Sequence, residues 1–198
     1  MHYFVITLLF AINSNMAIAG DPVIGKTKAI ICIGCHGADG NSSHSIYPKL
    51  AEQNEAYLIK QLNDFKKGTR KEEHMSSMVE AINIEDIPDI AAYFSSQQRI
   101  PSSIDNIKSI QGKQIFQAGI QEKKIPACAS CHGLKGTGNP PLNYPSLTGQ
   151  HKEYLIKTLK DFRSRTRHND INKIMRNATT KLTDNEINQL SDYISNLK

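Results

Sequence analysis

The chain has 198 residues, a formal net charge of +5, four cysteines and no tryptophan. That length suffices for one ordinary domain or two small ones, and the scarcity of aromatic residues, 7% of the chain, argues against nucleic acid as a partner. Residues 20–98 carry eight Lys and Arg against eleven Asp and Glu, a net of −3, whereas residues 99–198 carry sixteen against eight, a net of +8. This difference in charge either orients the molecule on a charged partner or reflects a chance difference in the composition of the solvent-exposed surface.

The first 19 residues predict a signal peptide. An apolar stretch from Phe4 to Ile12 is followed by polar residues and then by Ala17-Ile18-Ala19, a small-x-small cleavage pattern. The stretch is shorter than a membrane-spanning helix, which needs about 20 residues. We therefore expect cleavage after Ala19 and export of a soluble mature chain into an oxidising compartment. An N-terminal membrane anchor or a buried helix is the alternative.

The remaining chain contains two copies of one sequence. YPKLAEQNEAYLIKQLNDFKKGTR at 47–70 matches YPSLTGQHKEYLIKTLKDFRSRTR at 144–167, an offset of 97 residues. A period of this length is too long for a solenoid and indicates two duplicated domains. We predict domains at 20–98 and 110–198, joined by a polar linker at 99–109.

Both copies predict α-helices. Residues 57–65 in the first copy and 154–162 in the second place apolar side chains on one face of a helix with a period of 3.6 residues. A last helix is expected at 86–94 and again at 186–194. Extended runs of β-branched alternation are absent, so the predicted fold class is all-α, with three or four short helices in each domain.

Local signals mark where some of these helices begin. Gly25 and Gly112 are expected to open the helix that leads into each cysteine motif. Thr183, followed three residues later by Glu186, predicts a capping box at the start of the last helix. Domains this small bury a thin core and usually need a covalent or metal staple, for which a large apolar cofactor would also serve.

All four cysteines lie in two copies of the pattern C-x-x-C-H, CIGCHG at 32–37 and CASCHG at 128–133. A redox disulfide of this spacing normally stands in a βαβ setting, and structural zinc needs four ligands where each copy supplies three. The third interpretation is c-type haem attachment, in which both thiols form thioethers and the histidine binds the iron. We therefore predict two covalently bound haems c, with cysteine anchors and proximal histidines at Cys32, Cys35 and His36, and at Cys128, Cys131 and His132.

The repeat also selects a sixth iron ligand. Met75 and Met175 each lie 18 residues before the tyrosine of the last helix in their own copy, whereas Met78 has no counterpart. We predict Met75 and Met175 as the distal ligands and expect Met78 to be a core residue near the first haem. His74, which also lacks a counterpart, is the rival ligand.

Two further pairs of residues repeat around these sites. Pro48 lies 12 residues after the first proximal histidine and Pro145 lies 13 after the second. Each is expected to offer a backbone carbonyl to the imidazole, which would fix its tautomer and raise its basicity. Arg70 and Arg167 are candidates for pairing with haem propionates; the alternative is a solvent-exposed arginine at a helix end.

With these residues the chain resembles the dihaem cytochromes c4, which pack two class I cytochrome c domains together. The resemblance rests on CIGCHGADGN and CASCHGLKGTGN, on YPKLAEQ and YPSLTGQ, and on the methionine before each last helix. It covers everything after residue 19 and implies two tandem cytochrome c-like domains, each a few short helices around one covalent haem. It also implies ligation of the first haem by His36 and Met75, and of the second by His132 and Met175.

Histidine and methionine together leave no open iron position, so we expect an electron carrier and not an enzyme. The resemblance implies a periplasmic carrier in a respiratory chain, taking electrons from a donor such as a quinol-oxidising complex and giving them to a terminal oxidase. Peripheral association with the membrane is compatible with this function. Two alternatives stay open: the dihaem electron-accepting subunit of a larger enzyme, such as a flavocytochrome sulfide dehydrogenase, or a haem peroxidase in which one methionine is displaced.

Overall fold

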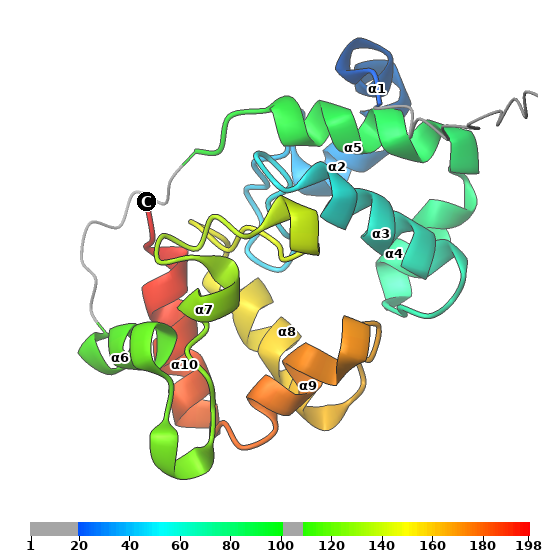
Figure 1. Cartoon of the computed structure of the whole chain (residues 1–198). Helices are drawn as coiled ribbons and strands as arrows, with labels where there is room; N and C mark the ends of the chain where they lie inside the picture. Colours follow the sequence, from blue (N-terminus) through cyan, green and yellow to red (C-terminus); the bar gives the residue numbers. More distant parts are fainter. Residues whose placement is uncertain (1–19, 101–108) are drawn as a thin grey trace, which may run out of the picture.

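The computed structural model describes residues 20–100 and 109–198. The predicted signal peptide at 1–19 and most of the predicted linker lie outside these ranges. Figure 1 shows two lobes that follow one another along the chain, α1 to α5 in the first and α6 to α10 in the second. Within the described ranges the only extended pairings are two isolated β-bridges, between Ile120 and Ile125 and between Asn139 and Tyr144. The all-α prediction is therefore confirmed.

The helices of the first lobe are α1 (Pro22–Lys28), α2 (Ile33–His36), α3 (Glu55–Lys66), α4 (Glu73–Glu80) and α5 (Ile87–Ser96). Those of the second lobe are α6 (Ile110–Ala118), α7 (Ala129–His132), α8 (Lys152–Ser164), α9 (Ile174–Thr179) and α10 (Asp184–Ser195). Short 3-10 turns lie at η1 (Ala29–Cys32), η2 (Ile84–Asp86), η3 (Gln121–Lys123), η4 (Pro140–Leu142) and η5 (Ile171–Lys173). Over the described residues each lobe thus has more helices than predicted, because the cysteine motif forms a four-residue helix of its own.

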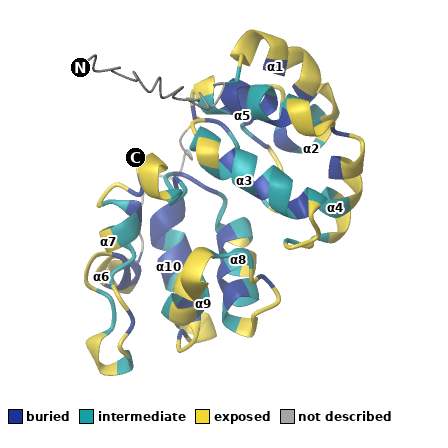
Figure 2. Cartoon of the chain, turned by 45° about the vertical axis from the view of Figure 1, so that its right-hand side comes forward, coloured by how far each residue is buried: buried dark blue, intermediate teal, exposed yellow. Residues whose placement is uncertain are grey.

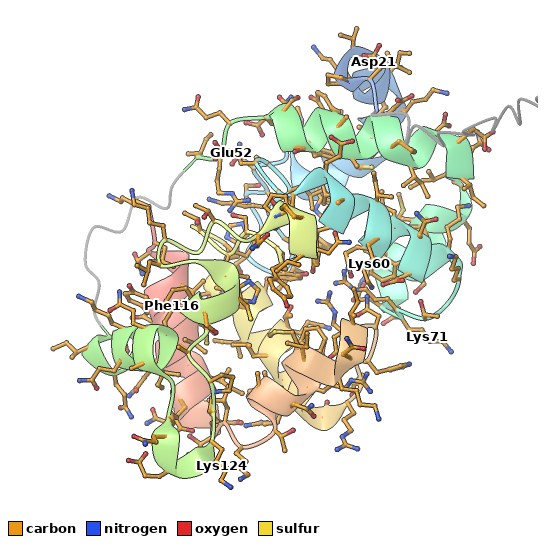
Figure 3. The ribbon with its side chains drawn as sticks, in the orientation of Figure 1. Asp21, Glu52, Lys60, Lys71, Phe116 and Lys124 are labelled. Carbon is orange, nitrogen blue, oxygen red and sulfur yellow. The ribbon has the colours of Figure 1, made fainter. Side chains whose placement is uncertain are left out.

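In each lobe the first helix packs against the last one at a glycine. An added Cβ at Gly25 of α1 would lie 1.9 Å from the carbonyl oxygen of Asp89 in α5. At Gly112 of α6 it would lie 2.0 Å from the carbonyl oxygen of Gln189 in α10. Only a residue without a side chain lets two helix backbones approach this closely. Figure 3 labels Phe116, a fully buried side chain of α6 in the same packed region.

These first helices begin earlier than the sequence predicted. Gly25 and Gly112 lie inside α1 and α6 and do not open them. The start of α1 is set by Asp21, whose carboxylate accepts hydrogen bonds from two N–H groups of the first turn. The start of α6 is set by Ser109, whose hydroxyl accepts from the N–H of Gly112. Capping side chains satisfy the free N–H groups there, and the glycines serve the helix crossing.

The last helix of each lobe supplies the largest share of the core. Residues of α5 and α10 are buried along most of their length, as the dark blue segments in Figure 2 show. The predicted capping box of α10 is confirmed: Thr183 and Glu186 each bond the other's backbone N–H. Lys123 adds an ion pair to Glu186 at 2.6 Å. No helix in the described ranges is both long and apolar enough to cross a membrane.

The lobes meet through the loops that follow the two cysteine motifs. Arg99, assigned to the linker from the sequence, is buried at this junction. Its Nε donates to the carbonyl oxygen of Ala51 at 2.9 Å, and its Nη1 donates to Ser146 Oγ at 2.9 Å. Lys60 of α3, labelled in Figure 3, reaches the second lobe by donating to the carbonyl oxygen of Asn169 at 2.8 Å.

We predict that Gly112→Ala destabilises the protein. The new methyl group would overlap the carbonyl oxygen of Gln189, so α6 and α10 must separate, and overpacking of this kind costs about 1–3 kcal/mol. The control is Gly34→Ala, because Gly34 is helical with nothing within 4 Å of an added Cβ, and its counterpart in the second copy is Ser130. Denaturant unfolding measures both; equal midpoints for the two variants would contradict the close helix contact.

Candidate functional site

One cavity of about 590 Å³ is lined by both lobes. Much of its wall is aliphatic and aromatic, with Leu58 and Phe65 on one side and Leu155 and Phe162 on the other. Such walls are typical of a site that buries a large organic ligand. The cavity is lined by every residue that the sequence singled out for haem binding: Cys32, Cys35, His36, Pro48, Arg70, Met75, Cys128, Cys131, His132, Pro145, Arg167 and Met175.

Each cysteine motif forms one tight turn at the wall of this cavity. Cys32 ends η1 and Cys35 lies in the one-turn helix α2, while Cys128 caps α7, which contains Cys131. The four thiols are free and partly buried. Burial raises the pKa of Cys32 to about 11 and that of Cys128 to about 12, so both are held as neutral thiols. Two thiols on one turn beside an apolar cavity match covalent attachment to an apolar cofactor, whereas each motif supplies only three of the four ligands of a structural zinc site.

The two histidines of the motifs are almost completely buried. His36 Nδ1 lies 2.9 Å from the carbonyl oxygen of Pro48, and His132 Nδ1 lies 3.0 Å from that of Pro145. A carbonyl oxygen can only accept, so each Nδ1 carries the proton and each Nε2 keeps a lone pair. Burial lowers the pKa of both imidazoles, and the bond to proline opposes this only in part. Both side chains are therefore neutral and have a nitrogen available to a metal.

The methionines differ in how far they are covered. Met75 in α4 and Met175 in α9 are half-buried and pack against the core of their own lobes. Met78 is 39% exposed, so the expectation that it is a core residue is wrong; its position one turn further along α4 carries it to the rim of the cavity. The side chain of His74, the rival ligand, is 66% exposed and lies 3.9 Å from Glu72.

The two arginines reach across the junction to the opposite lobe. Arg70 Nη2 donates to Tyr154 Oη at 3.2 Å, and Arg167 Nη2 donates to Tyr57 Oη at 3.0 Å. Both guanidinium groups also donate to the amide oxygen of Gln61, each at 2.9 Å. Arg167 is buried and Arg70 is half-buried, so neither is the solvent-exposed helix end that the sequence left open as an alternative.

This pairing concentrates positive charge at the cavity wall. Burial on its own would raise the pKa of Tyr154, but the charges of Arg70 and Arg167 outweigh it and lower the pKa to about 8. A buried positive field of this kind suits an anionic group such as a haem propionate. The cavity therefore offers all the groups that a c-type haem needs in each lobe: paired thiols, a neutral imidazole, a thioether and a guanidinium.

The sequence interpretation missed two residues that hold the lobes together, Gln53 and Gln150. Both are buried and each bonds the backbone of the other lobe. A signal was present, since these glutamines end the matching segments YPKLAEQ and YPSLTGQ at the 97-residue offset. A glutamine repeated at the same place in both copies is compatible with a shared structural role, but only the structure shows its partner.

An all-helical domain that presents C-x-x-C-H to an apolar cavity is the architecture of a c-type cytochrome, and two such domains in one chain define a dihaem electron-transfer protein. The sequence profile of the family named "Cytochrome c" matches this chain twice, at residues 25–98 and 109–198. The chain is 41% identical to the cytochrome c4 of Azotobacter vinelandii over 189 residues, which covers 90% of each protein.

Two further likenesses bear on the fold and on partners. The crystal structure of reduced recombinant cytochrome c4 from Pseudomonas stutzeri superposes with a TM-score of 0.87 at 42% identity, covering 91% of this chain and all of that one. A thiosulfate dehydrogenase electron acceptor of Stutzerimonas stutzeri (strain A1501) is 31% identical over 173 residues, covering 85% of this chain and 80% of that protein. The chain belongs to the cytochrome c family and, within it, to the dihaem cytochromes c4. It is an electron carrier with two covalently bound haems c.

We predict that replacing both cysteines of the second motif, with Cys128→Ala and Cys131→Ala, halves the covalently bound haem per chain. No thioether can then form in the second lobe, while Cys32 and Cys35 remain. Haem staining of the denatured protein and its pyridine haemochrome absorbance measure the loss. The control is Ser130→Ala, a change between the two cysteines that removes neither thiol; a full haem content in the double variant would contradict the assignment.

Proposed function

We propose that His36 and Met75 ligate the first haem iron and that His132 and Met175 ligate the second. The observation that carries this proposal is the hydrogen bond from each Nδ1 to a proline carbonyl, which leaves Nε2 as a neutral donor for a metal. Support comes from Met75 and Met175, which line the same cavity at matching positions of the repeat. Met78 and His74 also line the cavity but are more exposed, and His74 Nδ1 lies 3.9 Å from a carboxylate oxygen of Glu72.

When bound, each haem supplies an iron that changes its oxidation state by one electron, and the side chains around it set the conditions for that change. A methionine ligand favours Fe(II) and raises the reduction potential relative to a second histidine. Arg70 and Arg167 would offset the negative charge of the haem carboxylates. An iron held by both a histidine and a methionine of this chain would have no position left for oxygen, peroxide or substrate, which supports electron transfer without catalysis.

We predict that Met175→Ala lowers the reduction potential of one haem and removes half of the weak far-red absorption band that marks methionine bound to Fe(III). The thioether is lost in the second lobe only, and a weaker or oxygen ligand there favours Fe(III). The matched control is Met78→Ala, which removes a methionine that is half exposed and is not a proposed ligand. A spectroelectrochemical titration reads both quantities; an unchanged band in Met175→Ala would show that the ligand lies elsewhere.

We further propose that the protein is exported to the periplasm and carries electrons from a quinol-oxidising complex to a terminal oxidase. Export is supported by the signal-peptide pattern at residues 1–19 and by haem attachment through cysteines. The net charges of −3 for residues 20–98 and +8 for residues 99–198 favour different partners for the two lobes. Apolar side chains exposed at the cavity rim, Ile46, Leu142 and Ile171, suit brief docking of a redox partner close to the haems.

A second candidate is the dihaem electron acceptor of a sulfur-compound dehydrogenase. The observation that favours it is the 31% identity with a thiosulfate dehydrogenase electron acceptor over most of both chains. This candidate shares the haem sites and the carrier chemistry of the first. It differs in the proteins that deliver and accept the electrons, so the rates of reduction and oxidation by each partner decide between the two candidates.

We predict that membranes containing a terminal oxidase oxidise the reduced protein rapidly, at a rate that falls as salt is added. The basic second lobe steers the encounter by long-range attraction, which salt screens. Stopped-flow absorbance measures the rate over a range of ionic strength. Slow oxidation by these membranes, together with rapid reduction by a purified thiosulfate dehydrogenase, would favour the second candidate.

A further inference from the structure

One peptide group in each lobe makes two hydrogen bonds that point in opposite directions. In the peptide between Pro48 and Lys49, the carbonyl oxygen accepts from His36 Nδ1 at 2.9 Å. The N–H of the same peptide, on Lys49, donates to Oε1 of Gln150 at 2.8 Å. Gln150 belongs to the second lobe, so the proximal histidine of the first lobe is connected to the second lobe through a single peptide group.

The second lobe repeats this arrangement with the roles of the two lobes exchanged. The peptide between Pro145 and Ser146 accepts from His132 Nδ1 at 3.0 Å, and its N–H donates to Oε1 of Gln53 at 2.8 Å. Gln53 belongs to the first lobe. The two connections therefore cross: each proximal histidine depends on a glutamine of the opposite lobe.

Both glutamines are fixed in place. Gln150 Nε2 donates to the carbonyl oxygen of Lys49 at 2.9 Å, and Gln53 Nε2 donates to that of Ser146 at 2.8 Å. The side chains are 3% and 5% exposed, respectively. Because each amide bonds with both its oxygen and its nitrogen, and because water is excluded, its orientation is determined by the fold.

Hydrogen bonds that share a peptide group polarise one another and strengthen each by roughly 10–30%. Donation from the Lys49 N–H to Gln150 makes the Pro48 carbonyl oxygen a stronger acceptor. A stronger acceptor draws the Nδ1 proton of His36 away from the ring, which makes Nε2 a better donor to the iron. A better donor stabilises Fe(III) and lowers the reduction potential.

We propose that Gln150 and Gln53 are positioning residues that set the haem potentials crosswise, Gln150 for the first lobe and Gln53 for the second. The proposal rests on the proposed ligation of the irons by His36 and His132. It makes the contact between the lobes part of the redox site: each haem reaches its final potential only when the opposite lobe is docked.

The test replaces each glutamine with methionine, which has a similar volume but makes no bond to the peptide. Gln150→Met is expected to raise the midpoint potential of the first haem and leave the second unchanged, and Gln53→Met is expected to do the reverse. Spectroelectrochemical titration gives the two midpoints, and the shift caused by Met175→Ala identifies which midpoint belongs to the second haem. A shift in the haem of the mutated lobe, or equal shifts in both, would overturn the proposal.

A control separates this effect from a loosened junction. Asn54→Ala removes a neutral bond between the lobes, from Asn54 Nδ2 to the carbonyl oxygen of Tyr144, that does not involve either of the two peptide groups. It is expected to leave both midpoints unchanged. If it moves a midpoint as far as Gln53→Met does, junction packing and not the peptide connection is responsible.

Two more measurements keep the proposal testable if Gln150→Met folds poorly. Gln150→Glu retains an oxygen acceptor for the Lys49 N–H, so the first midpoint is expected not to rise; a rise would overturn the proposal. Amide hydrogen exchange of the oxidised wild-type protein is expected to show Lys49 and Ser146 protected, and rapid exchange there would overturn it. The ligation itself is checked separately by the methionine variants, so a failed crosswise pattern with intact methionine bands counts against this inference alone.

Discussion

Two buried imidazoles constrain the arrangement of the whole molecule. A histidine ring removed from water needs a partner for its N–H, and His36 and His132 each find one in the carbonyl of a proline. Proline fixes one backbone angle, and the N–H of the same peptide group is bonded to a glutamine of the other lobe, so the carbonyl is held in place. The loop around each proline is thereby pinned beside the cavity, and these two loops are also the surfaces on which the lobes meet.

Because the chain is duplicated, two kinds of contact at the junction occur twice, with the roles of the two copies reversed. A glutamine of each copy accepts a hydrogen bond from the backbone N–H after the proline of the other, and an arginine of each copy donates to a tyrosine of the other. The exchange is not perfectly symmetric, because both arginines also converge on Gln61, whose counterpart is Thr158. The two haem sites therefore share a scaffold but not an environment, and the net charges of the two halves differ as well.

Much of the site was predictable from the sequence because its chemistry is local. Two thiols and an imidazole within five residues need only one helical turn to come together, and the repeat selects Met75 and Met175 without structural knowledge. Prediction was weaker where a residue's role depends on a distant partner. Gly25 and Gly112 were expected at helix starts, whereas the backbones of α5 and α10 decide their position. Met78 was expected in the core, but the packing of α4 leaves it partly exposed.

The sequence by itself determined the two domains, the all-α class, the haem attachment motifs and the candidate axial ligands, since periodicity and short motifs carry this information within one segment. The tertiary structure alone decided which groups of the two copies face each other. Gln53 lies 93 residues from Ser146, and Gln150 lies 101 from Lys49, and neither separation has a local signature. Contacts of this kind exist only where the two folded lobes meet, because the backbone groups that they satisfy are buried there.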